Sequence, residues 1–259
     1  MKLSDHVDTI RERIYKAFNN QFSRLGIGAN KLIEIDKIPA ELHSKRKKIE
    51  ILIASHEGET GNYEEAREKA LDELTFTLFN RLAAIKVMEA HQLFAPVVTK
   101  QATHGGRSFG HKIWLENNPE KRNDDLEGLR DYFKFEFNKL GDAIPLFHKN
   151  YPYALLPYVI ELNDIVDAFN AVETDSDIIK TQQPTTNNQQ PNIWQSDDIL
   201  GLVIRKLQQR KETSAQRLWR QNRIRQSKPA ITGIYTTLGG RILGTQFLGE
   251  TVSGNVSRF

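Results

Sequence analysis

One stretch of the chain brings together the side chains from which a nucleic-acid contact could be built. It runs from 104 to 118 and reads HGGRSFGHKIWLENN. Its basic members are His104, Arg107, His111 and Lys112. Such groups can donate hydrogen bonds to DNA phosphates or to a base, so we name these four residues as candidate DNA contacts. The alternative, which the sequence leaves open, is a solvated loop whose aromatic residues pack on the core.

Other arrangements that could support chemistry are incomplete. The pair Gly26 and Gly28 lacks a preceding strand and a third glycine, so a helix end is favoured over a dinucleotide site. The step from Asn118 to Pro119 begins like the Asn-Pro-Pro-aromatic motif that grips a flipped adenine, but Glu120 follows. The chain has no cysteine, which excludes disulfides, thiolate zinc sites and cysteine nucleophiles.

Helical periodicity supplies the elements that would position the basic stretch. Apolar residues recur at spacings of three and four over 4–23, 40–55, 63–93, 124–140 and 159–171. The later half of the third segment, FTLFNRLAAIKVMEAHQLF, is apolar on most faces, so it is expected at the centre of the core. No alternating strand pattern stands out, and the predicted fold class is mainly α.

The charge distribution divides the chain at Gly201–Leu202. Residues 202–259 hold eleven Lys or Arg and two Asp or Glu, out of 36 and 33 in the whole chain. The remaining 1–201 therefore carry 25 basic and 31 acidic residues. We predict a helical domain over 1–201, with a linker or surface loop at 180–194 and a further helix from about 196. We expect 202–259 to be a poorly folded basic tail, whose last part, 233–259, has several glycines and no helical period.

The sequence also lacks the signals of a membrane or secreted protein. No apolar run reaches the ~18 residues that a membrane span needs. The N-terminus alternates charged and apolar residues and has no continuous apolar core of the signal-peptide kind. We expect a cytoplasmic protein without a membrane partner.

Three segments, in order, resemble the N-terminal region of the BREX-type adenine-specific DNA methyltransferases, the PglX family. They are FTLFNRLAAIKVMEAHQLF at 76–94, HGGRSFGHKIWLENNPEKRNDDLEGLRDYF at 104–133, and YPYALLPYVIELNDIVDAFN at 151–170. The first matches the family's aromatic-Asn-Arg-Leu step and its terminal Met-Glu through Phe79, Asn80, Arg81, Leu82, Met88 and Glu89.

The resemblance implies an activity for the full-length family. Its members transfer a methyl group from S-adenosylmethionine to the N6 amino group of adenine, which they flip out of the duplex. Their partners would be DNA and other phage-defence proteins. The resemblance places the cofactor glycines and the adenine clamp downstream of residue 259, so we name no catalytic or cofactor residue in this chain. Residues 1–201 would be the helical domain that packs on the methyltransferase core.

Beyond Gly201 the family-like sequence continues only when the codons are read one base further on. Leu202 and Val203 then permit tryptophan, and 203–209 permit LYESFN. The stretch 220–234 permits DKTEYDKVSLQSQV, 235–250 permit TPRWVVEFLVHNSLG, and the remainder permits KLYLEMYPD. The segment TPRW opens the cofactor-binding domain of the family. We therefore predict a reading-frame shift after Gly201, and a fragment that by itself methylates nothing.

An alternative from another class is a non-enzymatic DNA-binding or adaptor protein. It would use the basic tail as an electrostatic arm. The side chains concerned are Arg205, Lys206, Arg210, Arg217, Arg220, Arg223 and Arg225.

Overall fold

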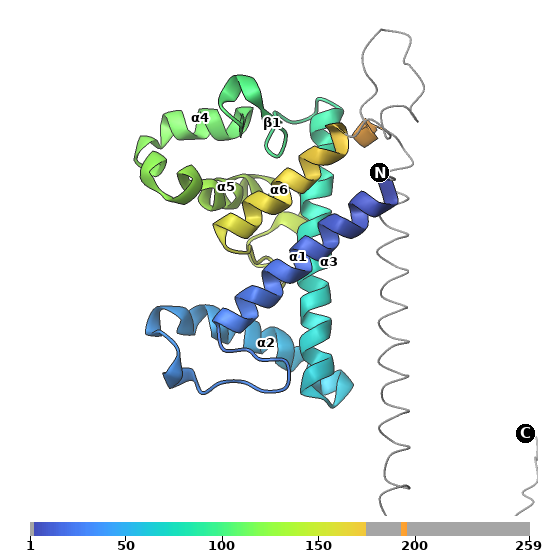
Figure 1. Ribbon diagram of the computed structural model, residues 1–259, viewed down its shortest axis with the longest axis vertical. Coiled ribbons are helices and arrows are strands. Elements are labelled where there is room, and N and C mark those ends of the chain that lie inside the picture. The colour runs from blue at the N-terminus through green and yellow to red at the C-terminus, as the bar shows by residue number, and fades with distance from the viewer. Residues whose placement is uncertain (1–2, 175–192, 196–259) are drawn as a thin grey trace, which may run out of the picture. The chain divides into compact units, whose positions relative to one another are not determined.

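The computed structural model describes residues 3–174 and 193–195, and this part of the chain is mainly helical, as predicted. Its α-helices are α1 Leu3–Arg24, α2 His43–Thr60, α3 Tyr63–Ala90, α4 Phe109–Asn117, α5 Leu129–Gly141 and α6 Val159–Thr174 (Figure 1). Lys100–Gln101 (β1) and Arg107–Ser108 (β2) form a short antiparallel pair. None of the described helices is long and apolar enough to cross a membrane. The expected boundary at Gly201–Leu202, the tail and most of the 180–194 linker lie outside the described residues.

Helix α3 is the element around which the others pack. It begins where the Asn62 side chain accepts a hydrogen bond from the backbone N–H of Glu64, at 2.9 Å, and acidic residues follow in its first turn, where the helix dipole favours them. Helices α1 and α2 both lie along it, and the short helix Pro145–Phe147 contacts it further on. In Figure 1 it runs the length of the domain behind α1. Its apolar residues are therefore covered from several sides, as its sequence predicts.

Two buried cations of α3 find their partners on distant elements. Arg67 donates from Nη2 to Oδ1 of Asn19 in α1, at 2.6 Å, and from Nη1 to the carboxylate of its neighbour Glu68, at 3.1 Å. The Lys86 side chain is fully buried, and its Nζ lies 2.8 Å from a carboxylate oxygen of Glu173 in α6 and 2.6 Å from Oγ1 of Thr99. A charge taken out of water costs several kcal/mol unless it is paired, so these contacts fix α1 and α6 against α3.

A third buried cation, Arg81, has aromatic rings around it in place of a carboxylate. Its Nε donates to the carbonyl of Leu146 at 2.8 Å. Its guanidinium carbon lies between 5.2 and 5.9 Å from the ring centroids of Phe137, Phe147 and Tyr151. Burial lowers the pKa of this guanidinium to about 10. Arg81 thus attaches the segment after α5 to α3 through a carbonyl and cation–π contacts.

The carboxylate of Glu89, at the end of α3, holds the backbone of the segment that follows. Its Oε1 accepts from the N–H groups of Val97, at 2.6 Å, and Val98, at 2.5 Å. Its Oε2 accepts from the N–H and the hydroxyl of Thr99. Asn170 of α6 donates to the carbonyl of Val98 at 3.0 Å. The chain entering β1 is thereby fixed between α3 and α6.

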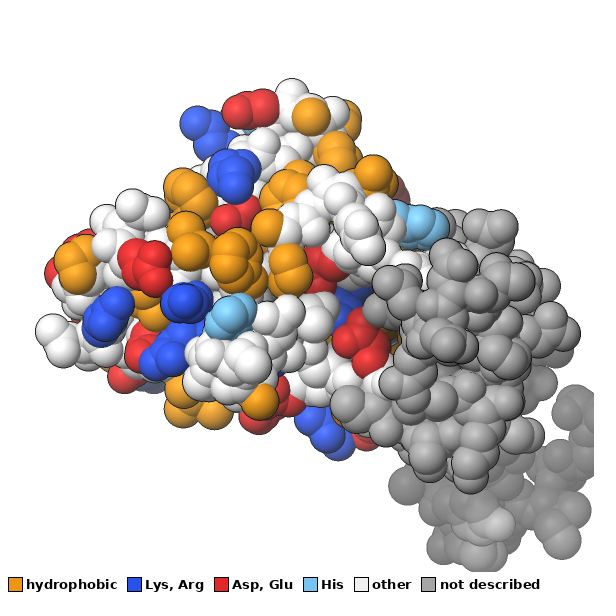
Figure 2. All heavy atoms as spheres, turned by 90° about the horizontal axis from the view of Figure 1, so that it is seen from above, with side chains coloured by type: hydrophobic (Ala, Val, Ile, Leu, Met, Phe, Trp, Pro, Cys, Tyr) orange, Lys and Arg blue, Asp and Glu red, His pale blue; other side chains and the backbone are white. Residues whose placement is uncertain are grey.

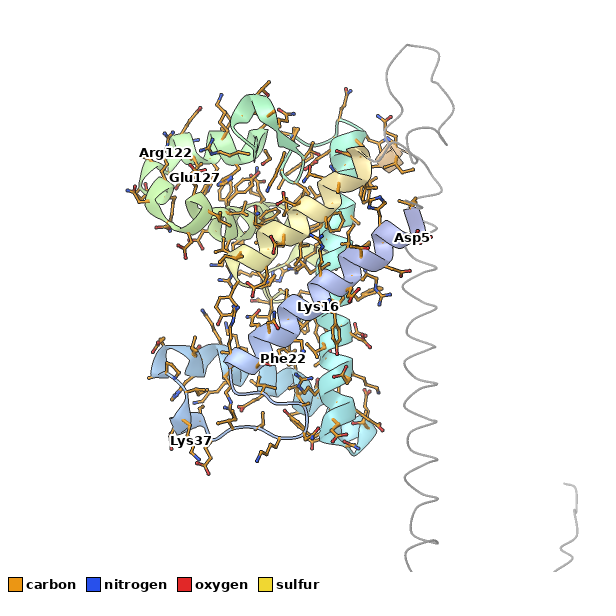
Figure 3. The ribbon with its side chains drawn as sticks, viewed as in Figure 1. Asp5, Lys16, Phe22, Lys37, Arg122 and Glu127 are labelled. Atoms are coloured by element: carbon orange, nitrogen blue, oxygen red, sulfur yellow. The ribbon has the colours of Figure 1, made fainter. Side chains whose placement is uncertain are left out.

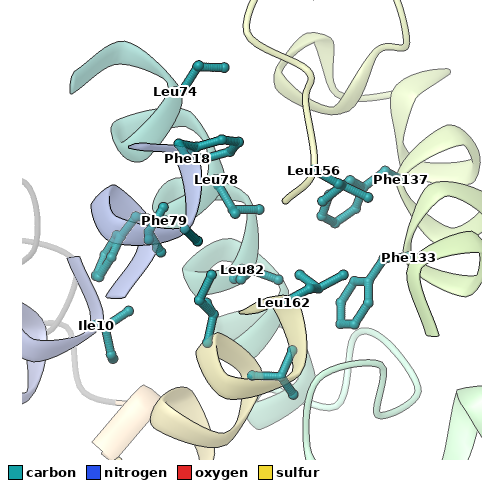
Figure 4. Packing of buried hydrophobic residues seen from close by; sticks show 14 of the residues in the cluster. Ile10, Phe18, Leu74, Leu78, Phe79, Leu82, Phe133, Phe137, Leu156 and Leu162 are labelled. Atoms are coloured by element: carbon teal, nitrogen blue, oxygen red, sulfur yellow. The ribbon is translucent and has the colours of Figure 1, made fainter. Parts of the chain in front are cut away.

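One continuous apolar core joins these helices. Figure 4 shows side chains of α1, α3, α5 and α6 converging, among them Phe18, Leu78, Phe133 and Leu162. The ring of Phe79 lies 5.4 Å from that of Phe169, centroid to centroid. The apolar face of each helix therefore packs against the same interior, which is what makes the domain one folding unit.

Substitution Glu89→Gln should destabilise the domain by about 2–3 kcal/mol, because one carboxylate oxygen becomes an NH2 group that faces backbone N–H donors. Urea unfolding followed by circular dichroism measures the change. The control Glu120→Gln alters an exposed carboxylate and should have little effect. Equal unfolding midpoints for the two variants would contradict the role given to Glu89.

Candidate nucleic-acid interface

The basic stretch around residue 107 folds as a hairpin followed by a helix, where the sequence predicts a loop. Gly105 and Gly106 form the turn with φ of 65° and 77°, a conformation that glycine adopts without strain. Ser108 then begins α4, because its hydroxyl accepts from the N–H of His111 at 3.2 Å. Gly110 permits a close approach, since a Cβ there would lie 2.3 Å from the hydroxyl of Tyr132.

His111, one of the four predicted DNA contacts, lies in the interior. Its side chain is buried, its ring stacks on Tyr132 with centroids 4.9 Å apart, and its Nε2 lies 2.9 Å from the carbonyl oxygen of Glu127. Burial lowers the pKa of this imidazole, because the charged form is disfavoured away from water. His111 therefore joins α4 to the segment before α5, and DNA cannot reach it in this conformation.

Arg107, the second predicted contact, is held by a carboxylate. Its Nε and Nη2 donate to the two carboxylate oxygens of Glu127, each at 2.5 Å, and its Nη1 donates to the carbonyl of His104 at 3.1 Å. The hydrogen bonds to Glu127 raise the pKa of the guanidinium, and they lower the pKa of the carboxyl. This two-pronged pairing is the geometry that guanidinium also offers to a phosphate.

The partner of Arg107 stands in a turn that residues with side chains rarely adopt. Leu126 and Glu127 have φ of 48° and 52°, and Gly128 follows with 65°. Such a conformation costs about 1–3 kcal/mol for each non-glycine residue unless the surroundings hold it. Arg107 and His111 stabilise this turn through their contacts with the carboxylate and the carbonyl of Glu127. The turn also explains why α5 begins at Leu129 and not at the predicted 124.

Three of the four predicted residues nevertheless line one hollow of about 240 Å³. Its walls come from the hairpin, α4 and the short helix Pro119–Asn123. The lining residues are Thr103, His104, Arg107, Lys112, Leu115, Glu116, Arg122 and Glu127. Figure 3 labels Arg122 and Glu127, which lie near each other at the α4 end of the domain. Arg122 was not predicted from the sequence, because only the fold brings it back to the hairpin.

The charges that line this hollow are nearly balanced. Arg107, Lys112 and Arg122 face two carboxylates, those of Glu116 and Glu127. The carboxylate of Glu127 pairs with Arg107, and the carboxylate of Glu116 lies 4.0 Å from the ammonium nitrogen of Lys112. The structure gives Arg122 no carboxylate within salt-bridge distance among the residues it describes. The hollow is therefore suited to one phosphate group, and not to a long stretch of nucleic-acid backbone.

An apolar groove of about 520 Å³ opens between α4 and α5. Phe109, Phe135 and Ile113 line it and are 37–45% exposed. The ammonium group of Lys139 lies 5.5 Å from the ring centroids of Phe94 and Phe135. Figure 2 shows hydrophobic side chains gathered on the face seen from above, with charged side chains around them. Exposed apolar surface of this kind is typical of a face that packs against another structured element.

Within the described residues, no three His, Asp or Glu side chains are grouped so that they could hold a metal ion. Comparison of the chain with protein-family models, with curated proteins and with solved structures gives no match. What this face can bind therefore follows from its own contacts, burial and charge.

The buried His111 predicts how stability changes with pH. Its pKa is lowered from 6.5 in the folded protein, so below about pH 6.5 the unfolded chain binds a proton that the folded one resists, and stability falls as the pH drops. In His111→Gln this part of the pH dependence should disappear, because glutamine does not titrate. Urea midpoints between pH 5 and 8 measure it. The matched control His91→Gln removes a histidine at an exposed position, and equal slopes for wild type and His111→Gln would contradict the assignment.

Proposed function

We propose that the described domain is the helical N-terminal domain of an S-adenosylmethionine-dependent, adenine-specific DNA methyltransferase of the BREX type. We propose further that the reading frame of this chain shifts after Gly201. The observation that carries the proposal is the order of family-like segments at 76–94, 104–133 and 151–170, continued by a family-like reading one base further on. Because each overlapping codon admits a minority of amino acids, chance rarely yields so long a continuation.

The packing of these three segments supports the proposal. They form the second half of α3, the hairpin with α4 and the start of α5, and most of α6. Arg81, a residue of the family's first motif, contacts the ring of Tyr151 in the third segment, 5.8 Å from its guanidinium carbon to the ring centroid. Glu89 of the same motif holds the backbone of Val97 and Val98, which leads to the second segment. A motif whose residues join segments distant in the chain is expected to persist in a family that shares the fold, even though those residues perform no chemistry.

In this proposal the domain positions DNA and the transfer takes place elsewhere. Lys112 and Arg122, with His104, would contact a phosphate beside the target site, which fixes register without reading sequence. The groove lined by Phe109 and Phe135 would pack against the methyltransferase core encoded in the shifted frame. That core would bind S-adenosylmethionine, whose methyl group the N6 nitrogen of the flipped adenine accepts.

Restoring the frame tests the proposal. Deleting one base at the start of codon 202, and continuing to the first stop codon of that frame, should yield a protein that transfers tritiated methyl groups to adenine in double-stranded DNA. The 259-residue chain, assayed beside it at the same concentration, should transfer none. Methyl transfer by the 259-residue chain alone, or none by a folded frame-restored protein, would overturn the proposal.

The basic tail favours the adaptor alternative, and truncation separates the two. A chain that ends at Gly201 lacks the eleven basic residues counted beyond it. If the 259-residue chain is an adaptor, removing the tail 202–259 should abolish both salt-dependent DNA binding in filter assays and the phenotype of the intact gene in cells. Under the methyltransferase proposal the tail is out-of-frame sequence, so its removal should have no phenotype.

A further inference from the structure

The charged residues of helix α2 are distributed unfavourably for a helix, with lysines near its N-terminal end and glutamates near its C-terminal end. Lys45, Lys47 and Lys48 lie in its first two turns, and Glu57 and Glu59 lie near its end. The N-terminal end of a helix is partially positive, so cations there are destabilising and carboxylates are preferred. Here no acidic residue stands in the first turn and no basic residue in the last. Helix stability therefore does not explain where these lysines lie.

These three lysines also lack the carboxylate partners that other lysines of the domain have. All three are exposed, and among the residues that the structure describes none of them lies within salt-bridge distance of a carboxylate. By contrast, Lys16 lies 2.9 Å from Glu12 in α1, and Lys134 lies 2.7 Å from Asp131 in α5. The positive charge of Lys45, Lys47 and Lys48 is thus not neutralised by direct contact with any carboxylate among the described residues.

Arg24 extends this positive surface beyond α2. The guanidinium carbon of Arg24 lies 4.7 Å from the ring centroid of Tyr158, and the ammonium nitrogen of Lys45 lies 6.0 Å from the same centroid. Half of the Arg24 side chain is exposed, although Glu161 pairs with it at 2.9 Å. We call Arg24, Lys45, Lys47 and Lys48 the α2 basic patch.

We propose that the α2 basic patch binds the phosphate backbone of double-stranded DNA. This inference rests on the proposed function, which makes DNA the substrate. Ammonium groups on flexible stems suit phosphates spaced along a strand, and contact with the backbone would offset the adverse charge order of α2. Ile51 is the large apolar side chain that this helix exposes, at 68%. One such side chain offers too little apolar surface for the helix to insert into a bilayer.

The patch would add a second point of DNA contact to the hollow at α4. In Figure 1 α2 lies beside the lower part of α3, and α4 lies to the side of α3, level with its upper part. The nearly balanced hollow, lined by Lys112 and Arg122, would bind one phosphate, whereas the lysines of α2 would contact the backbone further along. DNA would then be held at both ends of α3, which fixes its direction across the domain.

The salt dependence of DNA binding by the 259-residue chain tests this assignment. Each phosphate contact contributes a slope of about 0.9 to log K against log salt, so Lys47→Ala with Lys48→Ala should reduce the slope by about 1.8. The matched control, Lys16→Ala with Lys134→Ala, removes the same charge from paired lysines and should change the slope by less than about 0.5. The Tm of the α2 variant should not fall, since alanine favours the helix and relieves the charge order.

Equal slopes for the two double variants would show that only net charge matters, and would overturn the proposal. So would binding by the wild-type chain to vesicles containing phosphatidylserine that is lost in the α2 variant while DNA binding is unchanged. Loss of the slope difference leaves the proposed methyltransferase identity untouched, because that identity is tested by methyl transfer from the frame-restored protein.

Discussion

Three cations buried on one helix determine how the rest of the domain is arranged. Arg67, Arg81 and Lys86 of α3 are each 3% exposed or less, and a dry charge is tolerated only where hydrogen bonds or opposite charge meet it. Each has at least one partner remote in the chain: a side-chain oxygen in α1, the carbonyl of Leu146, and a carboxylate of α6. Arg67 pairs in addition with its neighbour Glu68. Apolar burial gives the helices a common interior, but it specifies position weakly, since many packings hide similar area. The buried cations favour one of these packings, because only in it does each charge meet its partners.

The same need to pair buried polar groups explains why two of the residues that suggested DNA binding make structural contacts instead. An arginine and a histidine near glycines and aromatic rings indicate a phosphate or base contact, yet they also suit a hairpin that must be fixed to a helix. In the structure Arg107 and His111 hold the strained turn at Leu126–Gly128. The proposed DNA contacts therefore rest on cations that have no carboxylate within salt-bridge distance among the described residues, Arg122 at the hollow and the lysines of α2.

The sequence predicts the long helices well because their apolar period reports burial directly. The segments 4–23, 63–93 and 159–171 correspond to α1, α3 and α6 with ends displaced by a few residues. It fails where a local rule competes with tertiary contacts. Glycines at 105, 106 and 110 suggested a loop, but Ser108 starts a helix beyond the turn, and the interior against Tyr132 requires glycine at 110. Periodicity also ran a helix through Leu126 and Glu127, whose left-handed conformation depends on Arg107, twenty residues earlier.

The nucleotide sequence of the gene from codon 201 to beyond codon 259 tests the central claim most directly. We predict that the frame one base further on reads tryptophan at codon 202, TPRWVVEFLVHNSLG across codons 235–250, and stays open until it supplies the glycines of a cofactor site. A stop codon in that frame, or codons that spell other residues at these positions, would contradict it.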